Sequence, residues 1–94
     1  MRPVWSPRAT LDLVDIRQRI ASENPAAARV IAQKIKSRVL VLEDFPSIGR
    51  VGRAPGTREL VVAGTPFVIA YRSAQGRITI LRVLHGARSW PSIP

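Results

Sequence analysis

The sequence predicts an α+β fold: an N-terminal edge strand, then an antiparallel helix hairpin packed on an antiparallel sheet, in the order β-α-α-β-β-β. Two stretches near the start carry apolar residues at intervals of three and four, which is typical of amphipathic helices. Three later stretches are short, rich in Val and Ile, and separated by turns that contain Gly or Ser, which is typical of a β-meander. Because 94 residues suffice for one core of this kind, we expect a single domain over residues 1–94.

The first two elements are a strand and a helix. The segment RPVWS, residues 2–6, is bounded by prolines and contains residues that favour strands, so it predicts a short edge strand. Ser6 followed by Pro7 is typical of a helix start, with a capping side chain and then a preset first turn. The apolar residues that follow predict a helix over about residues 7–22; they are Ala9, Leu13, Ile16 and Ile20.

The second helix begins in the same way, with Asn24 as the cap and Pro25 at the first helical position. Its expected apolar stripe consists of Ala27, Ile31, Ile35, Val39 and Leu42. The connection between the helices is so short that they should pack as an antiparallel hairpin. Four bases lie off the stripe, and we interpret them as an ordinary solvated helix face; they are Arg29, Lys34, Lys36 and Arg38.

The second half of the chain predicts a loop and then the meander. Residues 45–57, FPSIGRVGRAPGT, hold three glycines and two prolines and should form a loop. Strands are expected from residues 58, 66 and 77, with turns at Gly64–Thr65 and at SAQG, residues 73–76. In the last two strands both alternating rows are largely apolar, so both faces of the sheet need a cover. The helices can cover only one face. For the other we favour an obligate protein partner over the last ten residues of the chain.

Charge is the strongest compositional signal. Fifteen Lys and Arg residues oppose six Asp and Glu residues, giving a net charge of +9, and all but two of the bases are arginines. Because the guanidinium group suits carboxylates and phosphates, we expect an acidic protein or a nucleic acid as partner, the alternative being a merely solubilising surface. The chain has no Cys and one His, so we expect no metal or other cofactor. We also expect a cytoplasmic protein without membrane contact, since no apolar stretch is long enough for a signal peptide or a span.

The only histidine, His85, is the one candidate for a reactive group. Metal-free cleavage of RNA needs a base, an acid and cations that stabilise the phosphorane. In a ribonuclease, His85 would be the base or the acid, and Arg58 and Arg88 would bind the phosphate. A lone His at a strand end is more often a packed residue, and this alternative stays open. Asp12 and Asp15 are interpreted as partners of neighbouring arginines rather than as a catalytic pair.

Three stretches of the sequence resemble one protein family. FPSIGRVGRAPGTRELVV, GTPFVIAYR and ILRVLHGARSWP, together with the order of elements, are similar to the RelE/ParE superfamily of bacterial toxins over nearly the whole chain. The resemblance implies the toxin half of a type II toxin–antitoxin module, which inhibits growth and can stabilise plasmids. It implies a cognate antitoxin in a heterodimer or heterotetramer, with operator DNA contacted only indirectly through the antitoxin.

The superfamily divides by target. RelE-like members cut mRNA on the ribosome, whereas ParE-like members poison DNA gyrase. Here Phe67 lies where cleaving members usually place an arginine, no tyrosine follows His85, and ILRVLH is similar to the ParE branch. The resemblance therefore favours gyrase, with a ribosome-dependent mRNA endoribonuclease as the alternative, so whether the protein is an enzyme stays open. A basic nucleic-acid-binding module without toxicity is the third hypothesis.

The resemblance and the charge together suggest which residues contact the target or the antitoxin. They are Arg53, Arg58, Arg72, Arg82, Arg88 and Trp90. For Trp90, next to Pro91, we expect chiefly a structural role in which the ring seats the C-terminal tail against the fold.

Overall fold

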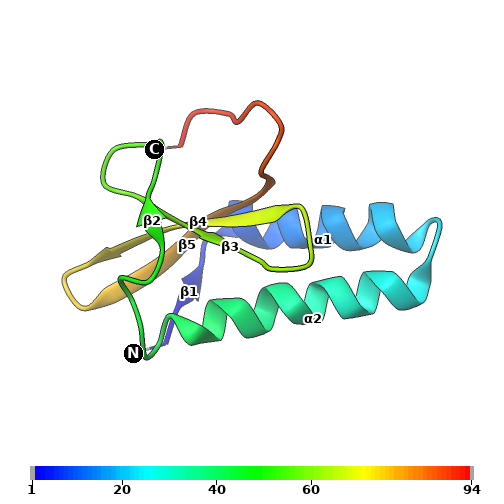
Figure 1. Cartoon of the computed structure of the whole chain (residues 1–94), viewed down its shortest axis with the longest axis horizontal. Coiled ribbons are helices and arrows are strands. Elements are labelled where there is room, and N and C mark those ends of the chain that lie inside the picture. The colour runs from blue at the N-terminus through cyan, green and yellow to red at the C-terminus, as the bar shows by residue number, and fades with distance from the viewer. Residues whose placement is uncertain (1, 94) are drawn as a thin grey trace.

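The computed structural model describes residues 2–93, and in it two helices pack against a five-stranded sheet (Figure 1). The elements in chain order are β1 (Val4–Trp5), α1 (Pro7–Ala21), α2 (Pro25–Val41), β2 (Arg50–Val51), β3 (Arg58–Val61), β4 (Phe67–Ala74) and β5 (Arg77–His85). The strand order across the sheet is β1-β5-β4-β3-β2. The predicted α+β class is confirmed.

The predicted starts of both helices are confirmed by their caps. The Ser6 hydroxyl accepts a hydrogen bond from the Ala9 amide at 3.0 Å, and the Asn24 side chain accepts one from the Ala27 amide at 3.1 Å. Each bond satisfies a backbone donor that has no partner inside the helix.

The buried stripe of α1 is the predicted one except that Ile20 is half-buried, whereas that of α2 differs at its N-terminal end. Ala28 and Ala32 are buried there in place of the predicted Ala27 and Ile31, which are half-buried. The reason is that a run of alanines offers apolar side chains in every direction, so the pattern does not fix which row faces inward. From Ile35 onward the predicted row is correct.

The sheet is mixed rather than antiparallel throughout. The meander of β3, β4 and β5 is antiparallel as predicted, but β1 pairs in parallel with β5, with Val4 opposite Thr79. A two-residue strand, β2, lies in the segment predicted to be a loop and pairs with β3. The turn between β4 and β5 is also tighter than expected, because Gln75 and Gly76 take positive φ angles of 53° and 72° and complete a two-residue hairpin.

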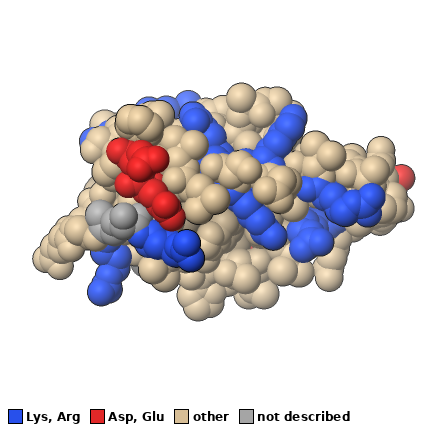
Figure 2. Space-filling model, turned by 90° about the horizontal axis from the view of Figure 1, so that it is seen from below, with Lys and Arg blue, Asp and Glu red and all other residues tan. Residues whose placement is uncertain are grey.

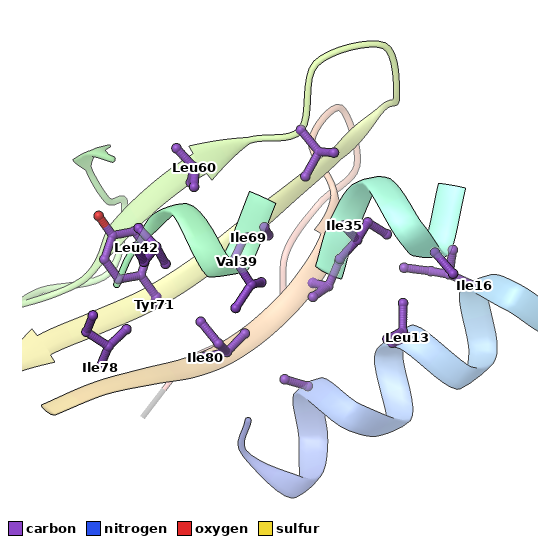
Figure 3. Close-up of a cluster of buried hydrophobic side chains, with 14 residues drawn as sticks. Leu13, Ile16, Ile35, Val39, Leu42, Leu60, Ile69, Tyr71, Ile78 and Ile80 are labelled. Carbon is purple, nitrogen blue, oxygen red and sulfur yellow. The ribbon is translucent and has the colours of Figure 1, made fainter. Parts of the chain in front are cut away.

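The core lies between the helices and one face of the sheet (Figure 3). Its largest fully buried side chain is Tyr71 on β4. The Tyr71 hydroxyl donates a hydrogen bond to the Pro46 carbonyl at 2.8 Å and accepts one from the Gly49 amide at 3.0 Å. The core thereby fixes the segment that connects α2 to β2.

The opposite face of the sheet is largely covered by the chain itself. The segment after β5 turns back and runs on the side of the sheet away from α2 (Figure 1). The Gly86 amide donates to the Pro66 carbonyl at 2.8 Å, and a β-carbon at Gly86 would lie 2.9 Å from a methyl group of Val68. Val68 and Ala70 are 5% and 1% exposed. The tail therefore covers much of the face for which a second protein was favoured, while Val61, opposite Val68 on that face, is 45% exposed.

Within residues 2–93, no helix is long and apolar enough to cross a membrane.

Candidate functional site

A cleft of about 380 Å³ lies between α1 and the ends of β4 and β5, and the tail forms its outer wall. Apolar side chains, arginines, two aspartates and a few other polar residues line it together: Arg8, Asp12, Asp15, Ile16, Arg19, Ile20, Phe67, Arg82, Val83, Leu84, His85, Arg88, Ser89 and Trp90. We call it the arginine cleft. Arg8 and Arg88 are exposed at its surface. The arginine cleft thus combines an apolar lining with accessible positive charge.

One wall of the arginine cleft is a clamp between α1 and β5. The two carboxylate oxygens of Asp12 accept hydrogen bonds from the Arg82 guanidinium at 2.7 and 2.9 Å, and one of them also accepts from the Val83 amide at 3.0 Å. Both side chains are 12% exposed. The hydrogen bonds to Asp12 raise the pKa of Arg82 above its usual value, although burial opposes them. Arg82 is therefore held within the fold by two of its five N–H donors.

His85 and Arg88 lie together at the arginine cleft. His85 Nδ1 accepts a hydrogen bond from the Ala87 amide at 3.3 Å, which leaves Nε2 as the ring nitrogen available to a ligand. The ring meets Phe67 edge to face, with centroids 6.1 Å apart. The Arg88 amide donates to the His85 carbonyl, and its side chain is exposed.

Trp90 seats the tail, as predicted. Its indole Nε1 donates to the His85 carbonyl at 3.0 Å, and the Arg53 guanidinium lies 3.5 Å from the centroid of its ring. Arg53 is oriented in turn by Glu59, which accepts from its Nε at 3.0 Å and from its backbone amide at 2.8 Å. Arg50 donates to the same carboxylate at 3.0 Å. Trp90 is thus held between the end of β5 and the β2–β3 segment.

Glu59 supplies the negative charge that pairs with Arg50 and Arg53 beside Trp90. Its side chain is only 3% exposed, and burial by itself would raise its pKa. The hydrogen bonds from the Arg53 side chain and backbone, and from Arg50, outweigh that effect and hold the pKa of Glu59 below its usual value. A buried carboxylate is stable here because it is paired and hydrogen-bonded.

The remaining candidate arginines lie away from the arginine cleft. Arg58 is paired across the sheet with Tyr71, whereas His85 is paired with Phe67. The two positions are four residues apart along β4, which corresponds to about 13 Å. The Arg58 guanidinium donates to the carbonyls of Ser47 and Gly49 at 3.3 and 2.8 Å.

Arg72, on β4, donates a hydrogen bond to the Pro55 carbonyl at 3.5 Å. The structure therefore brings His85, Arg82, Arg88 and Trp90 together and places Arg58 and Arg72 elsewhere. Within residues 2–93, no group of three or more His, Asp or Glu side chains could hold a metal ion.

The α1 side of the arginine cleft was missed in the sequence. Arg8, Asp12, Asp15 and Arg19 line it, and Asp15 pairs with Arg19 at 3.1 Å. These four residues follow one another at spacings of four, three and four, which places them on one helix face beside the apolar stripe. That repeat of charged residues was the signal that could have identified them. The predicted pairing with a neighbouring arginine is confirmed for Asp15, whereas the partner of Asp12 is Arg82, 70 residues away along the chain.

Comparison with known proteins identifies the family. The family described as "ParE toxin of type II toxin-antitoxin system, parDE" matches residues 4–90. The chain belongs to the ParE toxin family.

Relatives of known name and structure agree with this assignment. This ParE-family chain is 41% identical over 90 residues to the Y4kP protein of Sinorhizobium fredii, which covers 95% of the chain and 92% of that protein. It is 41% identical over 85 residues to Toxin RelE2 of Caulobacter vibrioides, and this alignment covers 90% of the chain and 94% of that protein. Among solved structures, the chromosomal ParDE TA system from P. aeruginosa superimposes with a TM-score of 0.82 at 29% identity, covering 88% of this chain and 92% of that one.

The resemblance to the RelE/ParE superfamily is thus confirmed. The protein is a toxin of a type II toxin–antitoxin system, and membership of such a system implies an antitoxin partner. The arginine cleft and the tail anchor lie within the matched residues 4–90 and are features of this ParE-family fold.

Proposed function

We propose that this ParE-family toxin acts in the cytoplasm by binding DNA gyrase, without enzymatic chemistry of its own, and that a cognate antitoxin neutralises it. The observation that carries the proposal is the separation of Arg58 from His85 along β4. Cleavage of RNA would require these groups to converge on one phosphate.

The groups that do meet at the arginine cleft support binding better than catalysis. His85 supplies one proton-transfer group there, and Arg88 supplies one exposed cation. Arg82 is engaged by Asp12. Phe67, which lies where cleaving members of the superfamily usually place an arginine, packs against the His85 ring. Metal-free cleavage requires a base, an acid and a phosphate-binding cation together. The two carboxylates of the cleft that could accompany His85 are both paired with arginines, Asp12 with Arg82 and Asp15 with Arg19.

The same cleft suits a segment of the antitoxin. Its apolar lining offers sites for aliphatic or aromatic side chains, while Arg8 and Arg88 offer positive charge at the surface. An antitoxin segment in which carboxylates alternate with apolar residues would complement both features. The resulting complex would be a heterodimer or a heterotetramer.

The test is a supercoiling assay with purified gyrase. We expect the toxin to inhibit supercoiling and to accumulate cleaved plasmid, and His85→Gln to retain this inhibition because no proton transfer is involved. Primer extension on RNA from induced cells is the second measurement. Codon-specific cuts in mRNA that disappear in His85→Gln, with supercoiling unaffected, would overturn the proposal in favour of an endoribonuclease.

Antitoxin binding is measured separately, by titration calorimetry of the purified pair. Arg88→Glu should weaken binding by tenfold or more, because it places a negative charge where a carboxylate is expected. Arg77→Glu makes the same charge change at an exposed position outside the arginine cleft and should have little effect. Equal effects of the two substitutions would reject the arginine cleft as the antitoxin site.

A further inference from the structure

The outer face of α2 carries positive charge that neither the proposed function nor the core uses. The helix contains Arg29, Lys34, Lys36 and Arg38 and no acidic residue between Pro25 and Val41. In the described part of the chain, none of these four bases forms an ion pair with a carboxylate. Figure 2 shows the face on which α2 lies, with Lys and Arg spread along it and acidic residues only towards its two ends. We call this surface the α2 face.

The four bases lie in two rows rather than in one patch. At 100° per residue, Arg29 and Lys36 lie on one flank of the helix, and Lys34 and Arg38 on the other. The buried row faces inward between the flanks. The stripe between them on the outside is exposed and uncharged, and contains Val30, Gln33 and Ser37. Arg29, Lys34 and Lys36 are exposed, while Arg38 also donates to the Val61 carbonyl at 3.2 Å.

We propose that the α2 face binds duplex DNA, with the helix along the major groove and its two basic flanks on the phosphates of the two strands. The major groove of B-form DNA is about 12 Å wide and admits an α-helix. Its borders are two rows of negative charge, which match two rows of bases separated by an uncharged stripe. An acidic peptide would present one row of carboxylates and would engage only one flank.

The spacing along each flank is also compatible with phosphates. Lys34 and Arg38 are separated by about 6 Å along the helix axis, and Arg29 and Lys36 by about 10 Å, from a rise of 1.5 Å per residue. Phosphates of one strand recur about every 3.4 Å of duplex axis, so each flank can reach two of them. The stripe offers one amide, Gln33, and otherwise short or apolar side chains, so binding should depend little on base sequence.

This inference goes beyond the proposed function, because it concerns direct contact between the toxin and DNA. It can be tested without gyrase. The probe is a fluorescently labelled 20-base-pair DNA of mixed sequence, and the measurement is its affinity for the purified full chain as a function of NaCl concentration.

The test variant is Lys34→Gln with Lys36→Gln, which removes one charge from each flank while keeping a good helix former at both sites. The control is Arg77→Gln, which removes one exposed charge on β5, outside the α2 face. Each phosphate contact contributes about 0.9 to the slope of log affinity against log salt concentration. We therefore expect the α2 double variant to lower the magnitude of the slope by about 1.8 and the control to leave it unchanged. Circular dichroism melting of both variants establishes that they are folded.

Three results would overturn the proposal. They are an equal slope change per charge removed in the α2 variant and the control, no slope change in the α2 variant, and an equal loss of affinity on a duplex RNA of the same sequence. The RNA comparison tests whether the helix enters the major groove, because the major groove of an A-form duplex is too narrow to admit it. The supercoiling assay remains a separate measurement. Inhibition of gyrase with an unaltered salt slope would reject the α2 face alone, and DNA binding without inhibition would reject the proposed target alone.

Discussion

Replacing Asp12 by Ala tests whether the clamp between α1 and β5 stabilises the fold. The substitution removes two short hydrogen bonds to Arg82 and one to the Val83 amide, and leaves a guanidinium that is 12% exposed without its partner. Removing one member of a buried ion pair costs about 3–5 kcal/mol. Because both side chains retain some contact with water, we take the lower value, about 3 kcal/mol. For a domain of this size that corresponds to a fall in melting temperature of at least about 12 °C.

The matched control is Asp15→Ala on the same helix. Asp15 pairs with Arg19 at 3.1 Å, but its side chain is 58% exposed, and such a pair contributes only about 0.3–0.5 kcal/mol. Urea unfolding followed by circular dichroism measures both losses. A double variant, Asp12→Ala with Arg82→Met, should lose less than the sum of its single variants, because it leaves no unpaired charge. Equal losses for the two aspartates would refute this reasoning.

Three further predictions concern the tyrosine, the buried carboxylate and the tail. Tyr71→Phe removes a hydroxyl that is hydrogen-bonded to both Pro46 and Gly49. The free energy of unfolding measured in a urea titration should therefore fall by about 1–3 kcal/mol. No change would mean that other contacts hold the connection after α2. Because folding lowers the pKa of Glu59, its stabilisation is fully present above the unfolded value of about 4.3 and is lost as pH falls further. Between pH 4.3 and the lowered pKa, Glu59→Gln should therefore show a weaker fall of melting temperature with pH than the unmodified chain, and parallel curves would contradict this. Trp90→Ala should release the tail and increase the rate of tryptic cleavage. Trp90→Phe keeps a ring over Arg53 and should increase that rate less. Identical cleavage rates in the two variants would show that the stacking does not hold the tail.

The elements that could be predicted from the sequence are those whose signals are local. Ser6 and Asn24 cap their helices through amides only three residues away, so both starts are visible in a few letters. The parallel pairing of β1 was not predictable in this way, because strand propensity carries no information about the direction of the neighbouring strand. A two-residue strand such as β2 is too short to show alternation.

In the candidate site, too, the residues with a local sequence signal were predicted and the others were not. His85, Arg88 and Trp90 were identified because they follow one another in the sequence and leave the same strand. The α1 side was missed because Asp12 and Arg82 are 70 residues apart, and only the folded chain joins them. Arg58 was grouped with His85 on charge and on the family resemblance, and the register along β4 separates the two residues.

The coverage of the second sheet face could not be read from the strands either. Apolar residues in both rows correctly indicated that a cover is needed, but the pattern does not distinguish a partner from the chain's own tail. Trp90 is the residue that distinguishes the two covers, because its ring stacks on Arg53 and its indole donates to the His85 carbonyl, which holds the tail on the fold.

The parallel contact between β1 and β5 also constrains the order of folding. The helix hairpin consists of local contacts and can form within microseconds, whereas pairing Val4 with Thr79 closes a loop of about 75 residues and incurs the corresponding loss of chain entropy. The apolar stripes of the hairpin find their counterpart only when β5 has joined the sheet, so we expect the isolated hairpin to be unstable and the rate-limiting barrier to coincide with the meeting of the two ends of the chain.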